Sequence, residues 1–300
     1  MTRLFEVTGI SKQSFYQMLQ RRKYKYEEQQ QLVPLIDEIR KDHPRMSARD
    51  MYIMLQPETM GRDQFERFCL ESGYRVKKIK NYRVTTNSLG VTRFPNMIKD
   101  IEVTRVNQVF VSDITYFEIG SRVYYLTFIM DLFNREVVGW SASDNLRTEN
   151  TTLPALRKVV WERGKANLKG AIIHSDGGGQ YYCKEFKELT RELEMLNSMT
   201  EEKVFENPHA ERLNGVIKNN YLYPYDPKDL KSLRKLLNKA VKMYNTKKPH
   251  RALGRSTPSN YLKTRIVDIK DNNQNNPSLS TLHNNDYFKR KINNKTVNAI

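Results

Sequence analysis

Val109-Phe-Val-Ser-Asp-Ile-Thr-Tyr116 is a short run rich in β-branched and aromatic residues, which favour strands. Val123-Tyr-Tyr-Leu-Thr-Phe-Ile-Met130 is a second, almost continuously apolar run, and Glu136-Val-Val-Gly-Trp-Ser141 is a third. The turn residues Asp131-Leu-Phe-Asn134 separate the second run from the third. Three strands in such close succession predict an antiparallel meander.

Helical and strand patterns alternate beyond this meander. Helical periodicity covers residues 148–163, 184–193, 208–222 and 229–244. Strand-like runs cover residues 170–174 and 195–199. A helix between two strands allows the strands to lie parallel in one sheet. The order of three strands, helix, strand, helix, strand, helix predicts an α/β ribonuclease-H-like core, a mixed five-stranded sheet with flanking helices.

The region 1–82 shows helical periodicity broken by short turns. Ser11 and Ser47 are suitable N-cap residues, and Gly61 breaks the chain before a further helix. Either helical pair alone fits an ordinary hairpin as well as a DNA-binding helix-turn-helix. Two pairs in tandem, followed by the basic run 75–80, favour DNA binding. We expect DNA contacts from Lys12, Tyr16, Arg21, Arg22, Arg62, Lys77 and Lys78.

Composition divides the chain into four parts. Residues 83–100 are polar and aperiodic, as is typical of a linker, and residues 263–300 are polar and rich in asparagine. We therefore expect an all-α helix-turn-helix region at 1–82, a linker at 83–100, the α/β core at 101–262 and a polar basic tail at 263–300. The tail is either solvated without function or a contact to DNA phosphates.

The chain is strongly basic, with 51 Lys and Arg against 34 Asp and Glu and a formal net charge of +17. This balance predicts a partner that is itself a dense line of negative charge, such as nucleic acid. Cys69 and Cys183 match no zinc spacing and are expected to be unreactive thiols. No apolar run reaches about 18 residues, and the start of the chain lacks a signal-peptide pattern. We expect a cytoplasmic protein that meets no membrane.

Three acidic residues stand in unusual local settings. Asp113 lies within the first predicted strand, Asp176 directly follows the fourth, and Glu211 lies on a predicted helix. If the first and fourth strands are neighbours, Asp113 and Asp176 can point at one spot, and the 34 residues before Glu211 suffice to return a helix to it. A single Asp in such a place is usually a turn or capping residue. The set of three predicts a metal-binding triad.

Three clustered carboxylates repel one another unless a cation is present. Oxygen ligands without cysteine or a histidine cluster select magnesium or manganese over zinc. Two such ions about 4 Å apart can activate an attacking oxygen and stabilise a leaving one at phosphorus. We expect His174, two residues before Asp176, to support the site by hydrogen bonding rather than to bind the ion, and Gln180 and Tyr181 to help position the substrate strand.

Five motifs occur in order between about Asn107 and Leu262. They are Asp113-Ile-Thr-Tyr116, His174-Ser-Asp-Gly-Gly-Gly-Gln-Tyr181, Asn197-Ser-Met-Thr200, Ala210-Glu-Arg-Leu-Asn-Gly-Val-Ile-Lys218, and Tyr244-Asn-Thr-Lys-Lys-Pro-His-Arg-Ala-Leu253 followed by Thr257-Pro258. This series resembles the bacterial insertion-sequence transposases of the IS-three family, relatives of retroviral integrases. The resemblance implies a DDE transposase in which Asp113, Asp176 and Glu211 hold two magnesium ions. Water would cut at the element's end, and the freed 3′-hydroxyl would attack another phosphodiester.

The resemblance also implies contacts and partners. Lys218 matches a basic residue that contacts the terminal DNA in this family, and Arg212 and Asn214 are weaker candidates for such contacts. The implied partners are double-stranded DNA, as terminal inverted repeats and target, and further copies of the chain, at least a dimer. Many family members also gain an upstream segment by frameshifting. The implied location is the bacterial cytoplasm, at the nucleoid.

Two other functions remain open on the sequence. A metal-dependent nuclease could share the core without strand transfer. A DNA-binding regulator could use the N-terminal helices alone, but it would require a broken triad, and the three acids are all present.

Overall fold

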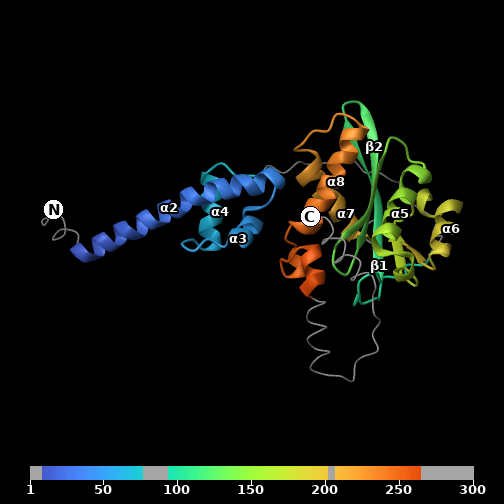
Figure 1. Cartoon of the computed structure of the whole chain (residues 1–300), viewed down its shortest axis with the longest axis horizontal. Coiled ribbons are helices and arrows are strands. Elements are labelled where there is room, and N and C mark those ends of the chain that lie inside the picture. Colours follow the sequence, from blue (N-terminus) through green and yellow to red (C-terminus); the bar gives the residue numbers. More distant parts are fainter. Residues whose placement is uncertain (1–8, 77–93, 202–206, 265–300) are drawn as a thin grey trace, which may run out of the picture. The chain divides into compact units, whose positions relative to one another are not determined.

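The computed structural model describes residues 9–76, 94–201 and 207–264 (Figure 1). The chain forms two compact units, Met1–Lys80 and Asn81–Ile300. Lys77 and Lys78, most of the predicted linker and nearly all of the predicted tail lie outside the described residues. Within the described part, no helix is both long enough and apolar enough to cross a membrane.

The N-terminal unit is helical. It contains α2 Lys12–Asp42, α3 Ala48–Leu55 and α4 Arg62–Glu71. Ser11 and Ser47 cap the first two of these helices as expected, because their side chains accept hydrogen bonds from Ser14 N and Asp50 N, respectively, both over 3.1 Å. A small core joins the C-terminal part of α2 to α3 and α4 through the side chains of Leu32, Ile36, Met51, Phe65 and Cys69.

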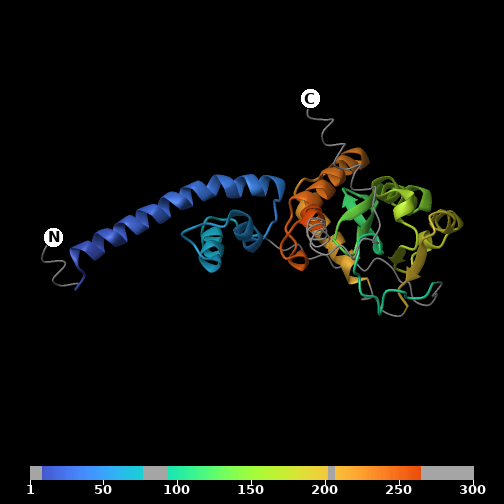
Figure 2. The same cartoon turned by 60° about the horizontal axis from the view of Figure 1, so that its bottom comes forward.

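Helix α2 differs from the short helix expected in the first helix-turn-helix. It runs without a break past Pro34 to Asp42, as one long helix in Figure 2. Ile10 and Leu19, which helical periodicity assigns to a covered face, are 40% and 41% exposed. The residues before Gly9 that would complete this unit lie outside the described part. The helix-turn-helix assignment and its DNA contacts therefore stay predictions.

The second unit contains the expected five-stranded mixed sheet. Its strands are β1 Val109–Ile119, β2 Arg122–Asp131, β3 Val137–Ser143, β4 Ile172–Ser175 and β5 Leu196–Met199. The strand order is β3-β2-β1-β4-β5. β1 to β3 form the predicted antiparallel meander, whereas β1 pairs with β4 and β4 with β5 in parallel. This is the ribonuclease-H-like arrangement expected from the order of elements.

Helices cover both faces of the sheet (Figure 1). The helices are α5 Thr152–Arg163, α6 Lys184–Glu192, α7 Pro208–Ile217 and α8 Leu230–Thr246, and a π-helical turn Lys218–Leu222 follows α7. Val109 and Val111 of β1 belong to the core under α7 and α8, and Phe110 belongs to the core under α5 and α6. Alternation along β1 therefore decides which helical layer each side chain meets.

The contact between α5 and β3 is close enough to require glycine. A Cβ atom at Gly139 would lie 2.3 Å from the backbone oxygen of Ala155 and 2.8 Å from a methyl group of Val159. Neither atom is the free end of a flexible side chain, so the packing distance of this helix against the sheet depends on the missing side chain.

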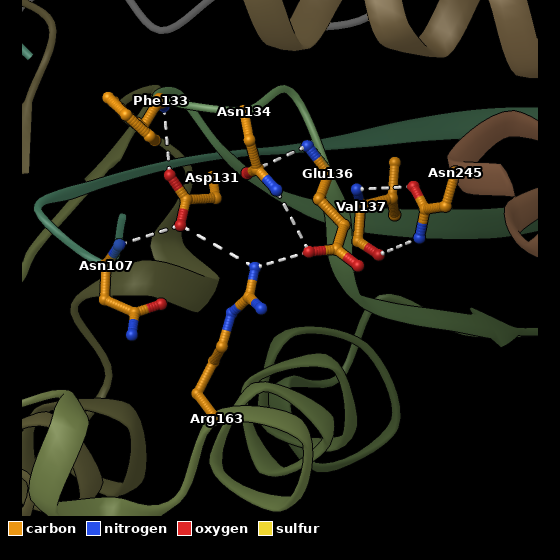
Figure 3. A network of polar contacts seen from close by, with 8 residues as sticks. All are labelled: Asn107, Asp131, Phe133, Asn134, Glu136, Val137, Arg163 and Asn245. Carbon is orange, nitrogen blue, oxygen red and sulfur yellow. Dashed lines mark hydrogen bonds and ion pairs between the residues drawn. The ribbon is translucent and has the colours of Figure 1, made fainter. Parts of the chain in front are cut away.

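A buried polar network anchors the turn between β2 and β3 (Figure 3). Arg163, at the end of α5, is only 1% exposed, and its Nη2 lies 2.8 Å from Glu136 Oε2 and 3.7 Å from Asp131 Oδ2. Asp131 also accepts hydrogen bonds from the backbone of Asn107 and Phe133. Burial raises the pKa of Asp131 to about 6, with Arg163 acting in the opposite direction. The network ties three distant segments together.

Candidate active site

Asp113 and Asp176 lie side by side because of the strand register. The parallel pairing of β1 with β4 runs up to Ser112 opposite Ser175, so the next residue on each chain is one of the two acids. Alternation gives Asp113 the same face of β1 as Val111, beneath α7. Asp176 follows the last residue of β4, where the chain leaves the sheet. The predicted neighbourhood of these two strands is confirmed.

Helix α7 supplies the third acid and two further polar side chains to the same region. Its N-terminal end is fixed by Asn207, whose Nδ2 donates to Ser112 O over 2.9 Å. Glu211, Asn214 and Lys218 follow at spacings of three and four residues, which place them along one helical face. Asn214 and Lys218 on this face reach β1.

The contacts from α7 to β1 are direct. Asn214 Nδ2 donates to Asp113 Oδ2 over 2.6 Å, and Lys218 Nζ donates to Thr115 Oγ1 over 2.8 Å. Asn214 is 4% exposed, so it holds the carboxylate from within the core. Lys218 is half-buried, and burial lowers its pKa while the charge of Asp113 raises it. The sequence marked both residues only as DNA contacts, and their contacts to β1 were missed.

The electrostatics of the three acids are those of a site that lacks positive charge. Burial raises the pKa of Asp113 to about 7, and the charges of Asp176 and, to a smaller extent, Glu211 raise it further. The backbone N–H of Ile114 and the charge of Lys218 oppose this rise. Burial also raises the pKa of Asp176, against a hydrogen bond from Gly178 N of 3.1 Å, and that of Glu211. Asp113 therefore senses the charge of both other acids.

The donor chemistry of this region fits a hard divalent cation. Carboxylate oxygens of Asp113 and Asp176 share one edge, and the amide oxygen Oδ1 of Asn214 is buried with no hydrogen-bond partner in the described part of the chain. Glu211 is exposed on the first turn of α7. Among the described residues, no three His, Cys, Asp or Glu side chains already lie close enough to hold a metal ion. The convergence of all three acids on a cation stays a prediction.

The residues expected to support the acids take other partners. His174 is buried and its Nδ1 lies 2.9 Å from Ser198 Oγ on β5. Tyr181 is buried and its hydroxyl lies 2.9 Å from Ser112 Oγ, directly before Asp113. Gln180 Nε2 donates to Leu146 O over 3.1 Å. Each side chain fixes the backbone around an acid, and their roles toward a substrate remain predictions.

Two segments match the family described as integrase core domain, over residues 103–203 and 199–258. The similar curated proteins come from bacterial insertion sequences. The 31 kDa protein of IS600 from Shigella sonnei is 26% identical over 85% of this chain and 95% of that protein. The transposase of IS629 from Shigella sonnei is 26% identical over 65% of this chain and 64% of its own length. The transposase InsF of IS3A from Escherichia coli is 28% identical over 43% and 44%.

The chain belongs to the insertion-sequence transposases of the IS3 type. The integrase core match extends from just before β1 to just before the end of the described residues, so it contains all three acids of the site. Some of the matched transposases are covered over less than two thirds of their length. Among solved structures, the catalytic core of HTLV-2 integrase in complex with magnesium is 23% identical, with a TM-score of 0.41 over 51% of this chain and 94% of that chain.

Proposed function

We propose that this protein is a DDE transposase that binds the ends of an insertion sequence, cleaves DNA there and joins the freed 3′-hydroxyl to another phosphodiester. The observation that carries the proposal is the pairing of Asp113 with Asp176 across β1 and β4, with α7 bringing Glu211 to the same region. The relatives named as transposases and the positive net charge support DNA as the substrate.

The proposed site would hold divalent cations between Asp113, Asp176 and Glu211, with magnesium favoured and manganese able to substitute. When bound, a pair of such ions activates the attacking oxygen and stabilises the leaving oxygen at phosphorus. Asn214 keeps Asp113 in one rotamer, because its amide donates to Oδ2. Lys218, held by Thr115, contributes positive charge beside this carboxylate, where a terminal phosphate would lie.

The test of strand transfer uses an end-labelled duplex that carries the terminal repeats of the element. Incubation of the full chain with this duplex, unlabelled target DNA and Mg²⁺ should attach the labelled 3′-end covalently to the target. Cleaved but unjoined ends would leave the metal-dependent nuclease as the function. Binding without cleavage would leave the DNA-binding regulator. Because two ends must meet, active complexes should contain at least two copies of the chain, and any upstream frameshifted segment should be tested by adding it.

Gly178 controls the position of the Asp176 carboxylate. A Cβ atom at this residue would lie 3.0 Å from Asp176 Oδ1 and 3.2 Å from Gln180 Oε1, whereas a Cβ atom at Gly179 would meet nothing within 4 Å. Neither glycine has a positive φ. We expect Gly178→Ala to lower the cleavage rate roughly tenfold or more, because small displacements of catalytic groups are costly. Gly179→Ala is the matched control, and equal rates for the two variants would contradict this role.

The raised pKa of Asp113 predicts a pH-dependent response to metal. Its pKa rises from 3.8 to about 7 on folding, so in metal-free buffer this group's contribution to stability is lost as the pH rises through that interval. A divalent cation favours the ionised form and reverses the loss. We expect the increase in Tm caused by Mg²⁺ to be small at pH 5 and to grow as the pH passes about 7. A Tm increase that is the same at every pH would contradict this expectation.

A further inference from the structure

The turn between β2 and β3 carries an arginine in an unfavourable backbone conformation. Arg135 has a φ of 58°, in the left-handed region that residues other than glycine seldom adopt. Its neighbours are fixed on both sides, because Asn134 Nδ2 donates to Glu136 Oε2 over 3.1 Å and Glu136 O accepts from Asp131 N over 2.9 Å (Figure 3). The network around Arg163 therefore holds the turn that presents Arg135 to its surroundings.

The charge of Arg135 is not neutralised within the described residues. Its Nη1 atom is buried and has no hydrogen-bond partner in that part of the chain. The two acids of the same turn, Asp131 and Glu136, lie 3.7 and 2.8 Å from Arg163 Nη2. Burial lowers the pKa of Arg135, and the nearby charge of Arg212 lowers it further. A half-buried guanidinium without its own counter-ion is unfavourable unless an anion is supplied from outside.

The side chains around Arg135 are cationic or neutral donors. Arg212 comes from α7, and Tyr244 and His250 come from the end of α8 and the segment after it, with their rings 4.5 Å apart. Burial, then Lys248, Arg212 and Arg135, lower the pKa of His250 to about 3, so its imidazole is neutral. Its Nε2 atom also has no hydrogen-bond partner within the described residues. Asn245 fixes this end of α8 to β3 by bonding both backbone groups of Val137 over 2.9 Å.

We propose that Arg135 and Arg212 together bind one backbone phosphate of DNA next to the catalytic carboxylates. The planar guanidinium groups match phosphate oxygens in geometry and charge. Arg212 directly follows Glu211 on α7, so a phosphate bound here belongs to the same stretch of DNA that the acids act on. The inference rests on the proposed function and adds to it a phosphate site at the turn between β2 and β3. The strained backbone is then maintained for binding.

The variant Arg135→Gly separates binding from stability. Glycine adopts a positive φ without strain, so the Tm should stay the same or rise. DNA affinity of the full chain should fall roughly tenfold, as for a lost hydrogen bond to a charged group. A plot of log affinity against log salt should lose about 0.9 from its slope, the value for one phosphate contact. The measurement is fluorescence anisotropy with a short duplex in buffer containing EDTA, so that no cleavage occurs.

Lys187→Gln on α6 is the matched control, because it removes one positive charge from an exposed helix in the layer opposite α7 and α8, and it should leave the salt slope unchanged. The proposal is overturned if Arg135→Gly binds with wild-type affinity and slope. It is also overturned if the Tm falls together with affinity, because Arg135 then acts through the fold. Wild-type protein that binds DNA but never transfers a strand would instead reject the proposed function and leave this binding result interpretable.

Discussion

Asp113→Asn abolishes cleavage and strand transfer, with a loss of about 1,000-fold or more, while binding to the element's ends is retained. The loss is expected because asparagine cannot supply the negative charge that holds a divalent cation, and such cations contribute several kcal/mol at the transition state. Asparagine keeps an oxygen that can accept the hydrogen bond from Asn214, so the local geometry survives. Affinity for DNA should be unchanged or higher, since one negative charge near the phosphates is gone.

The matched control is Glu118→Gln, which neutralises an exposed acid farther along the same strand. Both variants are compared in a single-turnover cleavage assay and in DNA binding at fixed salt. The stability readout is independent of activity. Because the charged form of Asp113 is disfavoured by burial, the metal-free asparagine variant should melt above the wild type at pH 8 and close to it at pH 5. Cleavage by Asp113→Asn at the rate of the control would remove this residue from the proposed catalytic set.

Arg163→Met destabilises the core by about 3 to 5 kcal/mol, as expected when one partner of a buried ion pair is removed. Glu136 and Asp131 would remain buried, at 7% and 0% exposure, without the cation that lies between them. The same network fixes the turn before β3, so the loss should be accompanied by weaker protection of amide hydrogens at the start of that strand. The measurement is denaturant unfolding at pH 7 together with hydrogen exchange.

Lys165→Gln provides the comparison for Arg163→Met. It breaks an ion pair with Glu192 of the same N···O distance, 2.8 Å, but the two side chains are 58% and 66% exposed. Exposed pairs contribute little, because water solvates both charges. We expect no measurable change in unfolding for this variant. If the two substitutions were equally costly, burial would not be what makes the Arg163 network important.

Local sequence patterns were sufficient for much of the fold. The β-branched and aromatic runs of β1 to β3 and the alternation of β4, α6 and β5 with turns fixed the elements to within a few residues, because each pattern depends on neighbours in sequence. The N-caps at Ser11 and Ser47 were likewise readable. The length of α2 was not, because the turns expected in a helix-turn-helix gave no sign that this helix continues past Pro34 to Asp42.

The candidate site divides in the same way. The three acids could be chosen from their local settings and motifs, and the register of Asp113 beside Asp176 follows from two strands that the sequence already suggested were neighbours. The hydrogen bond from Asn214 to Asp113 and the contact of Lys218 with Thr115 join residues about a hundred positions apart. No periodicity or spacing specifies such contacts, since they depend on how α7 packs on the sheet.

By itself, the amino-acid sequence determined the order of strands and helices, the basic character of the chain and the identity of the three acids, because these are set by local propensity and composition. Only the tertiary structure decided which charges are satisfied. It placed Arg163 between two buried acids, left Arg135 without a partner among the described residues and raised the pKa of Asp113 to about 7. These properties depend on burial and on distances between segments remote in sequence, which exist only once the helices have packed on the sheet.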